Sequence, residues 1–346
     1  LVISPTPKNP LRNILKNKFH LYDKPSNELE FYKNTYVYRP PYLKIPNNKL
    51  KGLTLNNLSK AISSYNFFTE IKLIHAHFGQ NGIASLTLKK ALNVPLITSF
   101  YGYDSGRLGK TFRPYYKELI INGDIFLVLS NDMKKDLIYL GFPENKIKLH
   151  RLGIDLNVFK SKITKNEKFT LLTVARLDET KGVQYVIHAL HKFFLSYPQE
   201  RNNIIYKIVG SGPYEKELKR LISKLNLKDQ VIFINNLSVS NGRDIVLSEM
   251  TNCDLFLLCS STSKAGGKEG TPVVLMEAQA CGKPCISTYH AGIPEVVINN
   301  KTGILVKEHS TEEISIALKT LYYNNELRLI LGNNAREHIT SHITKN

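Results

Sequence analysis

Short apolar runs alternate with longer amphipathic segments along most of this chain. In the first half, they predict strands at residues 71–76, 95–100, 124–129 and 147–150, and helices at residues 55–70, 82–92, 112–122 and 131–140. In the second half, they predict strands at residues 169–175, 203–209, 231–234, 254–258, 284–287 and 303–306, with helices in the gaps and at residues 311–321 and 326–339. Continuous apolar strands that alternate with helices are typical of parallel sheets covered on both faces. The pattern therefore predicts an α/β protein.

A polar, lysine-rich segment at residues 156–168 interrupts this alternation, and we interpret it as a linker. It separates a predicted N-terminal domain at residues 1–155 from a C-terminal domain at residues 169–346, and both are expected to be doubly wound and Rossmann-like. Before the regular alternation begins, residues 1–7 look like the end of a strand and residues 35–38 are strand-like. Ligands bind such sheets beyond the carboxyl ends of their strands. We therefore expect the functional site in a central cleft that the two domains face.

Charge is the strongest signal in the composition. The chain has 47 Lys and Arg against 29 Asp and Glu, a formal net charge of +18. Such an excess favours anionic partners such as phosphates, nucleic acid or an acidic membrane surface. The lysines are spread along the chain and form no basic helix or arginine-rich tract, so we expect no nucleic-acid binding. A peripheral contact with an anionic membrane stays open.

No segment reaches the roughly 18 apolar residues that span a bilayer. The first residues also lack the apolar run of a signal peptide, so we expect a cytoplasmic protein, with a peripheral place at the cytosolic membrane face left open. Cys253, Cys259, Cys281 and Cys285 lack the spacing of a zinc site or of a secreted disulfide framework. We expect reduced thiols in the core.

Two glutamates eight positions apart, Glu269 and Glu277, connect a glycine-rich loop to a predicted helix. Thr271 suits the N-cap, Pro272 suits the first helical position, and Gly282 would end the helix after about three turns. The N-terminus of such a helix presents unpaired backbone amides that can bind a phosphate or a sugar oxygen. The spacing by itself favours an ordinary buried helix, so a functional role for the two glutamates depends on the neighbouring loops.

Three other loops follow predicted strands of the second half. Arg176 and Lys181 lie beside a predicted helix start, where two cations could bind a diphosphate, although a solvated charged turn is equally consistent. Gly210 and Gly212 would let the backbone approach a ligand closely, but Gly-x-Gly alone is weak evidence. The last of these loops, at residues 289–295, could simply be a turn.

Together these segments resemble the retaining, nucleotide-sugar-dependent glycosyltransferases of family 4, which have the two-domain GT-B fold. The matching segments occur in the family's order, at residues 174–182, 210–212, 269–277, 292–295 and 300–306. A looser match covers residues 75–79, 98–104, 130–135 and 150–155. The chain is most similar to enzymes that build bacterial capsule, exopolysaccharide and lipopolysaccharide units.

The resemblance implies a hexosyltransferase that needs neither metal nor cofactor and takes a UDP- or GDP-sugar as its donor. Its partners would be this donor and a lipid-linked or polysaccharide acceptor. Arg176 and Lys181 would hold the donor diphosphate and stabilise it as the leaving group. Glu277 would bind the ribose hydroxyls, and Glu269 would contact the transferred sugar.

The resemblance also assigns residues that complete the donor site and line the acceptor side. The further donor-binding residues would be Gly210, Gly212, Gly270 and Thr271, the last two through their backbone amides. His75, His77 and Asp104 would lie on the acceptor side, although one of the histidines could equally be packed at a strand end.

This chain departs from the family in two places. Tyr101 stands where many members have a histidine near the donor sugar, so Tyr101 is a catalytic candidate whose side chain could shift the sugar preference or abolish activity. Residues 1–7 look like the family's second strand, so we expect one strand–loop–helix unit to be missing ahead of Leu1. A catalytically silent GT-B remnant or scaffold is therefore an alternative hypothesis. A GT-B nucleotide-sugar epimerase is another, although Arg176 and Lys181 fit the transferase pattern better.

Overall fold

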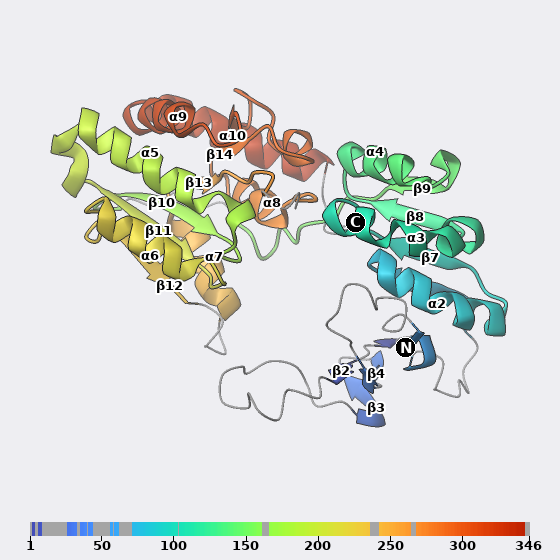
Figure 1. The fold of residues 1–346 in the computed structure, drawn as a ribbon. Coiled ribbons are helices and arrows are strands. Elements are labelled where there is room, and N and C mark those ends of the chain that lie inside the picture. The colour runs from blue at the N-terminus through green and yellow to red at the C-terminus, as the bar shows by residue number, and fades with distance from the viewer. Residues whose placement is uncertain are drawn as a thin grey trace. The chain divides into compact units, whose positions relative to one another are not determined.

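The computed structural model describes residues 71–342 except 103, 161–165, 236–241 and 264–267, and before residue 71 it describes residues 2–3, 6–8, 26–32, 35–39, 41–43, 56–57 and 59–61 (Figure 1). Most of the predicted helix at residues 55–70, part of the predicted linker and most of the glycine-rich loop before Glu269 therefore lie outside the described residues.

The chain divides into two compact units. The first comprises Leu1–Val128 and Lys134–Leu149, and the second comprises Leu129–Met133 and His150–Asn346. The domain boundaries expected from the sequence, with a linker at residues 156–168, stay a prediction.

The first unit contains a parallel four-stranded sheet in the order β6-β7-β8-β9. Its strands are β6 (Ile74–His77), β7 (Leu96–Ser99), β8 (Ile125–Val128) and β9 (Ile147–Leu149), and its helical elements are α2 (Gly79–Leu92), α3 (Arg107–Asn122) and η3 (Glu144–Lys146). Helix α4 (Asn131–Leu140) begins in the short segment assigned to the second unit and belongs to the first unit from Lys134 on. Two small sheets precede it, β1-β4-β3 and β2-β5, formed by β1 (Val2–Ile3), β2 (Thr6–Lys8), β3 (Ser26–Tyr32), β4 (Thr35–Arg39) and β5 (Pro41–Leu43). The strand predicted at residues 35–38 is thus confirmed.

Aromatic side chains form the core of this unit. Phe100, Tyr116, Phe126 and Phe142 are buried and meet edge to face, with ring centroids 4.7 Å apart for Phe126 and Phe142 and 5.3 Å apart for Tyr116 and Phe142. This geometry places the positive ring edge against a negative ring face. The packing joins the residue after β7 and the second residue of β8 to α3 and to the segment after α4.

The second unit contains a parallel six-stranded sheet in the order β12-β11-β10-β13-β14-β15. Its strands are β10 (Phe169–Val174), β11 (Ile204–Val209), β12 (Val231–Ile234), β13 (Leu255–Leu258), β14 (Cys285–Thr288) and β15 (Gly303–Val306). Its helical elements are η4 (Glu179–Lys181), α5 (Val183–Ser196), η5 (Pro198–Asn202), α6 (Glu215–Lys224), α7 (Gly242–Asn252), α8 (Val273–Ala280), η6 (Ile293–Glu295), α9 (Thr311–Tyr323) and α10 (Asn325–His342). In order of sequence this is a 3-2-1-4-5-6 sheet, in which the strand order reverses between β10 and β13.

Alternate side chains of these strands enter two separate hydrophobic cores. Leu171 packs into the core formed with α5, α6 and α9, whereas the adjacent Leu172 packs into the core formed with α7 and α8. Strand β13 repeats this alternation with Leu257 and Leu258. Because helices cover both faces of the sheet at β10 and β13, these strands can be apolar on both sides, which explains their nearly continuous apolar runs in the sequence. The α/β prediction of two parallel sheets is confirmed.

Some element boundaries differ from the prediction. Helix α3 begins at Arg107, five residues before the predicted start at Phe112, and Pro114 lies inside it. A proline lacks a backbone donor and favours the first turn of a helix, so the sequence pattern placed the start too close to Pro114.

Candidate active site

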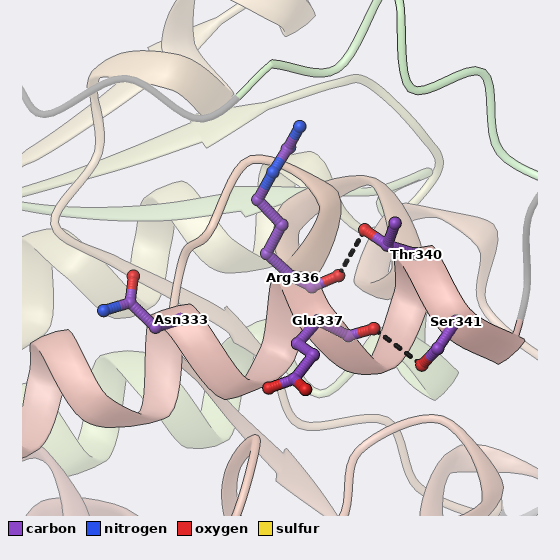
Figure 2. Close-up of a pocket in the computed structure, with 5 residues that line it drawn as sticks. All are labelled: Asn333, Arg336, Glu337, Thr340 and Ser341. Atoms are coloured by element: carbon purple, nitrogen blue, oxygen red, sulfur yellow. Dashed lines mark hydrogen bonds between the residues drawn. The ribbon is translucent and has the colours of Figure 1, made fainter.

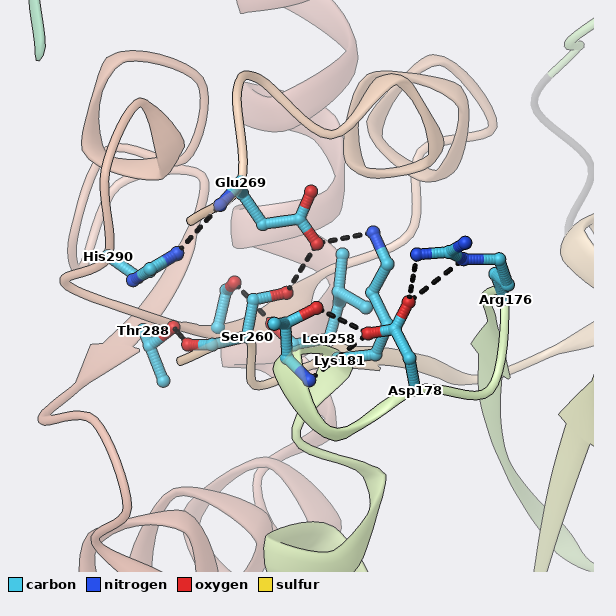
Figure 3. Close-up of polar contacts among 10 residues, drawn as sticks. Arg176, Asp178, Lys181, Leu258, Ser260, Glu269, Thr288 and His290 are labelled. Carbon is cyan, nitrogen blue, oxygen red and sulfur yellow. Dashed lines mark hydrogen bonds and ion pairs between the residues drawn. The ribbon is translucent and has the colours of Figure 1, made fainter. Parts of the chain in front are cut away.

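The candidate site lies at the carboxyl edge of the second unit's sheet, in the loops that follow β10, β13 and β14. The first of these loops carries Arg176 and Lys181 (Figure 3). Asp178 caps η4 by accepting the backbone N–H of Thr180 at 3.1 Å, and its other oxygen accepts from the Nη2 of Arg176 at 2.6 Å. The Arg176 side chain is 75% exposed. Arg176, one of the two cations predicted to bind the diphosphate, therefore has a carboxylate partner but stays accessible.

Lys181 forms an ion pair with Glu269, so the structure brings two of the predicted residues into direct contact (Figure 3). The same Glu269 oxygen accepts the hydroxyl of Ser260 at 3.1 Å. Both charged side chains are largely enclosed, with exposures of 21% for Lys181 and 11% for Glu269. The predicted sugar-binding carboxylate is thus held by a predicted phosphate-binding cation.

The backbone of Glu269 is held separately from its carboxylate. Its N–H donates to Nε2 of His290 at 3.0 Å, and Nδ1 of His290 lies 2.7 Å from Glu308. Ser260, His290 and Glu308 were not predicted from the sequence. The available signal for His290 was its place in the loop after β14, a loop that could simply be a turn and whose residues 292–295 match the family.

Three glycines of this edge allow backbone segments to pack against each other. A Cβ atom would lie 1.7 Å from the Cys259 carbonyl oxygen at Gly182, 2.0 Å from the Ala175 carbonyl oxygen at Gly210, and 2.2 Å from that of Leu177 at Gly212. Gly182 and Gly210 also have positive φ, of 68° and 137°. The close approach of the loops at the strand ends therefore requires glycine at these positions, whether or not a ligand binds there. The donor-binding role of Gly210 and Gly212 stays a prediction.

The predicted start of the helix after Glu269 is wrong. Pro272 has an extended backbone and is itself the N-cap of α8, which begins at Val273 and is eight residues long rather than about three turns. Thr271 is buried, and its hydroxyl donates to the carbonyl oxygen of Leu129 at 3.2 Å instead of capping the helix. A tertiary hydrogen bond has replaced the local one that the sequence suggested. Gly270, which precedes Thr271, is buried.

Glu277 lies in the middle of α8 and is half-buried. Burial raises the pKa of the Glu277 carboxyl, and the nearby charge of Arg243 acts in the opposite direction. Within the part of the chain that the structure describes, no hydrogen bond to this carboxylate is found. A ligand that donates hydroxyl groups could supply the missing donors.

Glu295, in a segment that carries the family resemblance, has structural partners within the second unit. It accepts from the backbone N–H of Asn131 at 2.7 Å and from a guanidinium nitrogen of Arg151 at 2.8 Å. Its carboxylate is therefore committed to holding chain segments together.

In the first unit, the predicted residues gather where β6 and β7 end. The rings of His75 and His77 stack with centroids 4.5 Å apart, and the Nδ1 of His77 lies 2.5 Å from the Tyr101 hydroxyl. Burial raises the pKa of Tyr101, a hydrogen bond from Ser99 lowers it, and the charge of Asp104 raises it further. Tyr101 is thus a neutral hydroxyl beside His77 at neutral pH.

Asp104 is 3% exposed and binds the backbone through both oxygens. Oδ1 accepts the N–H of Tyr101 and Oδ2 accepts the N–H of Gly79, each at 2.8 Å. Because the N-cap residue of α2, Phe78, provides no side-chain cap, Asp104 satisfies the first amide of that helix from a distance. Burial raises the pKa of the Asp104 carboxyl, and these backbone donors oppose the shift.

A shallow hollow of about 390 Å³ runs along α10, lined by Asn333, Arg336, Glu337, Thr340 and Ser341 (Figure 2). The hydroxyls of Thr340 and Ser341 donate to carbonyl oxygens of their own helix, and Arg336 donates to the carbonyl oxygens of Phe159 and Ala280. None of its lining residues was predicted, and three of them, Arg336, Thr340 and Ser341, use their polar groups within the fold.

Three expectations concern metals, membranes and cysteines. The described residues contain no cluster of three or more His, Cys, Asp or Glu suited to a metal ion. None of the helices in the described parts of the chain is long and apolar enough to cross a membrane. The four cysteines are free and buried, as expected for core thiols.

Solved structures with the same architecture are GT-B glycosyltransferases. Anabaena Alr3699/HepE in complex with UDP-glucose superposes with a TM-score of 0.70 at 18% identity, over 89% of this chain and 82% of that one. Sucrose-phosphate synthase from Thermosynechococcus elongatus gives a TM-score of 0.75 at 20% identity, over 91% and 81%. At these identities the likeness establishes the fold, and the GT-B prediction is confirmed.

The family follows from the sequence comparison. Residues 155–338 match the family model of glycosyl transferases group 1, and residues 14–158 match that of glycosyltransferase family 4. The chain belongs to the group 1 family of glycosyl transferases, as the resemblance had indicated.

Its relatives include glycosyltransferases that are named for colanic acid and amylovoran biosynthesis. WcaL of Salmonella typhimurium, a glycosyltransferase named for colanic acid biosynthesis, is 35% identical over 70% of this chain and 59% of its own length. The amylovoran biosynthesis glycosyltransferase AmsK of Erwinia amylovora is 31% identical over 74% and 62%. An uncharacterized glycosyltransferase of Methanocaldococcus jannaschii is 28% identical over 95% and 87%. The chain thus spans about three fifths of the length of the first two relatives.

Proposed function

We propose that this chain is a retaining glycosyltransferase that moves a hexose from a UDP- or GDP-sugar to a lipid-linked or polysaccharide acceptor in cell-surface polysaccharide biosynthesis. The observation that carries the proposal is the grouping of Arg176, Lys181 and Glu269 at the carboxyl edge of β10 and β13. Family membership and the relatives named for colanic acid and amylovoran biosynthesis support it.

In the proposed reaction, Arg176 and Lys181 bind the donor diphosphate. As the bond between the sugar and the phosphate breaks, negative charge grows on the bridging phosphate oxygen, and positive charge develops on the sugar ring. Fixed cations beside that oxygen stabilise this charge, which is the largest contribution in many enzymes. Because these two side chains supply the cations, the proposal requires no metal.

Lys181 has to exchange partners for this to happen. In the structure its ammonium binds the Glu269 carboxylate. A diphosphate would compete for Lys181 and release Glu269 to accept hydroxyl groups of the transferred hexose. Glu277, whose carboxylate has no hydrogen-bond donor among the described residues, would bind the ribose hydroxyls, and the amides of Gly270 and Thr271 would orient sugar and phosphate.

The acceptor side of the proposal concerns the first unit. His75 and His77 are exposed near the end of β6 with their rings stacked, and a hydroxyl of the acceptor could bind there. Asp104, also expected on this side, is buried and binds backbone amides. The net charge of +18 would suit an acceptor at an anionic cytosolic membrane face, where each basic side chain contributes about 1 kcal/mol.

Calorimetry with UDP and with GDP tests the donor site, with UDP first because the related HepE structure contains a UDP-sugar. We expect one nucleotide to bind the parent chain and to bind Arg176→Ala and Glu277→Ala more weakly. Absence of binding to the parent, or unchanged binding to both variants, would refute the assignment.

Release of free nucleotide from a panel of UDP- and GDP-sugars then separates an enzyme from a silent remnant. Turnover of at least one sugar is expected, and Tyr101→His should change which sugar is preferred. Binding without any turnover would favour the remnant.

A further inference from the structure

Loops after three successive strands of the sheet are linked in one chain of hydrogen bonds. Glu308 follows β15, His290 follows β14, and Glu269 lies in the loop after β13. Glu308 Oε1 lies 2.7 Å from Nδ1 of His290, and Nε2 of His290 lies 3.0 Å from the backbone nitrogen of Glu269. The His290 ring is 1% exposed, so water does not compete for either nitrogen. Figure 3 shows the imidazole directed at the Glu269 amide.

The partners determine which nitrogen of His290 carries the proton. A backbone N–H can only donate, so Nε2 has to accept from Glu269. A carboxylate can only accept, so Nδ1 has to carry the proton that it donates to Glu308. Only the neutral ring with its proton on Nδ1 satisfies both partners. A proton on Nε2 would face the Glu269 amide hydrogen and break the contact.

Glu308 also holds the other end of the same segment. Its Oε2 accepts the backbone N–H of Thr262 at 2.7 Å. One carboxylate therefore anchors Thr262 directly and Glu269 through His290. Hydrogen bonds to an ionised acceptor are about twice as strong as neutral ones.

We propose that Glu308 and His290 are positioning residues that fix the backbone of Glu269, so that its carboxylate keeps its place when a donor diphosphate draws Lys181 away. The inference rests on the proposed role of Glu269. Neither residue touches the donor, and both act through the Glu269 amide. The anchor is needed because Lys181 and Ser260 hold Glu269 only through its carboxylate, and the first of these contacts would be lost on donor binding.

Two variants test the anchor, each against the same surface control. Glu308→Gln leaves a single acceptor oxygen for two donors, so either Thr262 loses its partner or His290 moves its proton to Nε2. His290→Phe keeps the ring volume and removes both hydrogen bonds. Glu312→Gln serves as control, because Glu312 is an exposed acid paired with Lys192 on the surface.

The first readout needs no catalysis. Nitrogen-15 NMR of the parent should show one histidine signal with its proton on Nδ1 that disappears in His290→Phe and changes in Glu308→Gln. Hydrogen exchange at the Glu269 amide should become roughly 2- to 10-fold faster in both variants, as expected for one lost hydrogen bond. The control should match the parent. A proton on Nε2 in the parent, or unchanged exchange in both variants, would overturn the proposal.

The second readout uses UDP and a UDP-sugar that the parent turns over. UDP affinity should stay within about twofold of the parent, whereas kcat/KM should fall by roughly 10- to 100-fold, as expected when a reacting group is misplaced. Equal kcat/KM in parent and variants would contradict a positioning role. If the parent binds no nucleotide, the proposed function fails, and the exchange and NMR results still decide whether the anchor exists.

Discussion

The ammonium of Lys181 and the carboxylate of Glu269 form an ion pair, although the two residues are 88 positions apart in the sequence. Arg176 is likewise paired with Asp178. Each predicted phosphate-binding cation thus has a carboxylate partner in the structure. On donor binding, the diphosphate would therefore replace these carboxylates as the partner of the cations. Because Glu269 would then be free to bind the sugar, binding of the diphosphate and binding of the sugar would be coupled, and this coupling can be measured.

Replacing Lys181 by Met should weaken nucleotide diphosphate binding by roughly 10- to 100-fold, because a charged hydrogen bond contributes about 1.5–3 kcal/mol. Calorimetry with UDP or GDP measures this change. Lys192→Met, which breaks an exposed pair with Glu312, is the matched control and should bind like the parent. Equal affinity of both variants would remove Lys181 from the donor site.

Replacing Gly182 by Ala should destabilise the second unit by at least about 2 kcal/mol, since strain at an unfavourable backbone angle adds to a severe clash. The new Cβ would lie 1.7 Å from the Cys259 carbonyl oxygen, at a φ of +68°. Chemical denaturation gives the change in the free energy of unfolding.

Asn300→Ala provides the control for this effect. Asn300 has a φ of 57° in an exposed turn, so its replacement should cost only about 1 kcal/mol of backbone strain. Losses of equal size in the two variants would show that the tight backbone contact at Gly182 contributes nothing.

The contribution of Glu308 to stability should depend on pH. Burial raises the pKa of the Glu308 carboxyl, but hydrogen bonds from the Thr262 backbone and from His290 outweigh it, and the pKa lies below its usual value of 4.5. A carboxyl with a lower pKa in the folded than in the unfolded chain stabilises the fold above the unfolded value, and this stabilisation is lost as pH falls through the folded value.

Denaturation of the parent and of Glu308→Gln across pH measures this contribution. The parent should have the larger free energy of unfolding at neutral pH, and the difference should shrink below pH 4.5. A difference that is constant or grows on acidification would mean that the carboxylate charge is not what holds Thr262 and His290.

Replacing Asp104 by Asn should destabilise the first unit by about 1–3 kcal/mol, the cost of a buried amide left without its partner. Asparagine has one acceptor oxygen for the two backbone N–H groups of Tyr101 and Gly79. Glu118→Gln, at an exposed position of α3, should change the free energy of unfolding far less. If the two variants unfold alike, Asp104 does not act as the remote cap of α2.

The sequence predicted the strands of the second unit closely because most of them are short, largely apolar runs bounded by polar or turn residues. Strands β12 and β15 were predicted with the observed bounds, Val231–Ile234 and Gly303–Val306. The start of α8 was not, because the Thr271 hydroxyl bonds Leu129, a residue 142 positions away, and no local rule contains that contact.

In the candidate site, too, some residues could be predicted from the sequence and others could not. Spacing alone left Arg176, Lys181 and Glu269 undecided, and the family resemblance gave them their expected donor-site roles, which stay predictions. His290 and Glu308 escaped notice, because their link to Glu269 depends on β13, β14 and β15 lying side by side. Glycines that suggested ligand contact are also required for close backbone packing.

By itself, the sequence determined the fold class and the order of the elements, and it predicted the segments that would carry the chemistry, because apolar periodicity, turn residues and short motifs are local properties. Only the tertiary structure decided which charges meet. Lys181 reaches Glu269 because β10 and β13 are neighbours at the point where the strand order reverses. Lateral strand order follows from hydrogen bonding and packing between distant segments, and that order converts two separate motifs into one site.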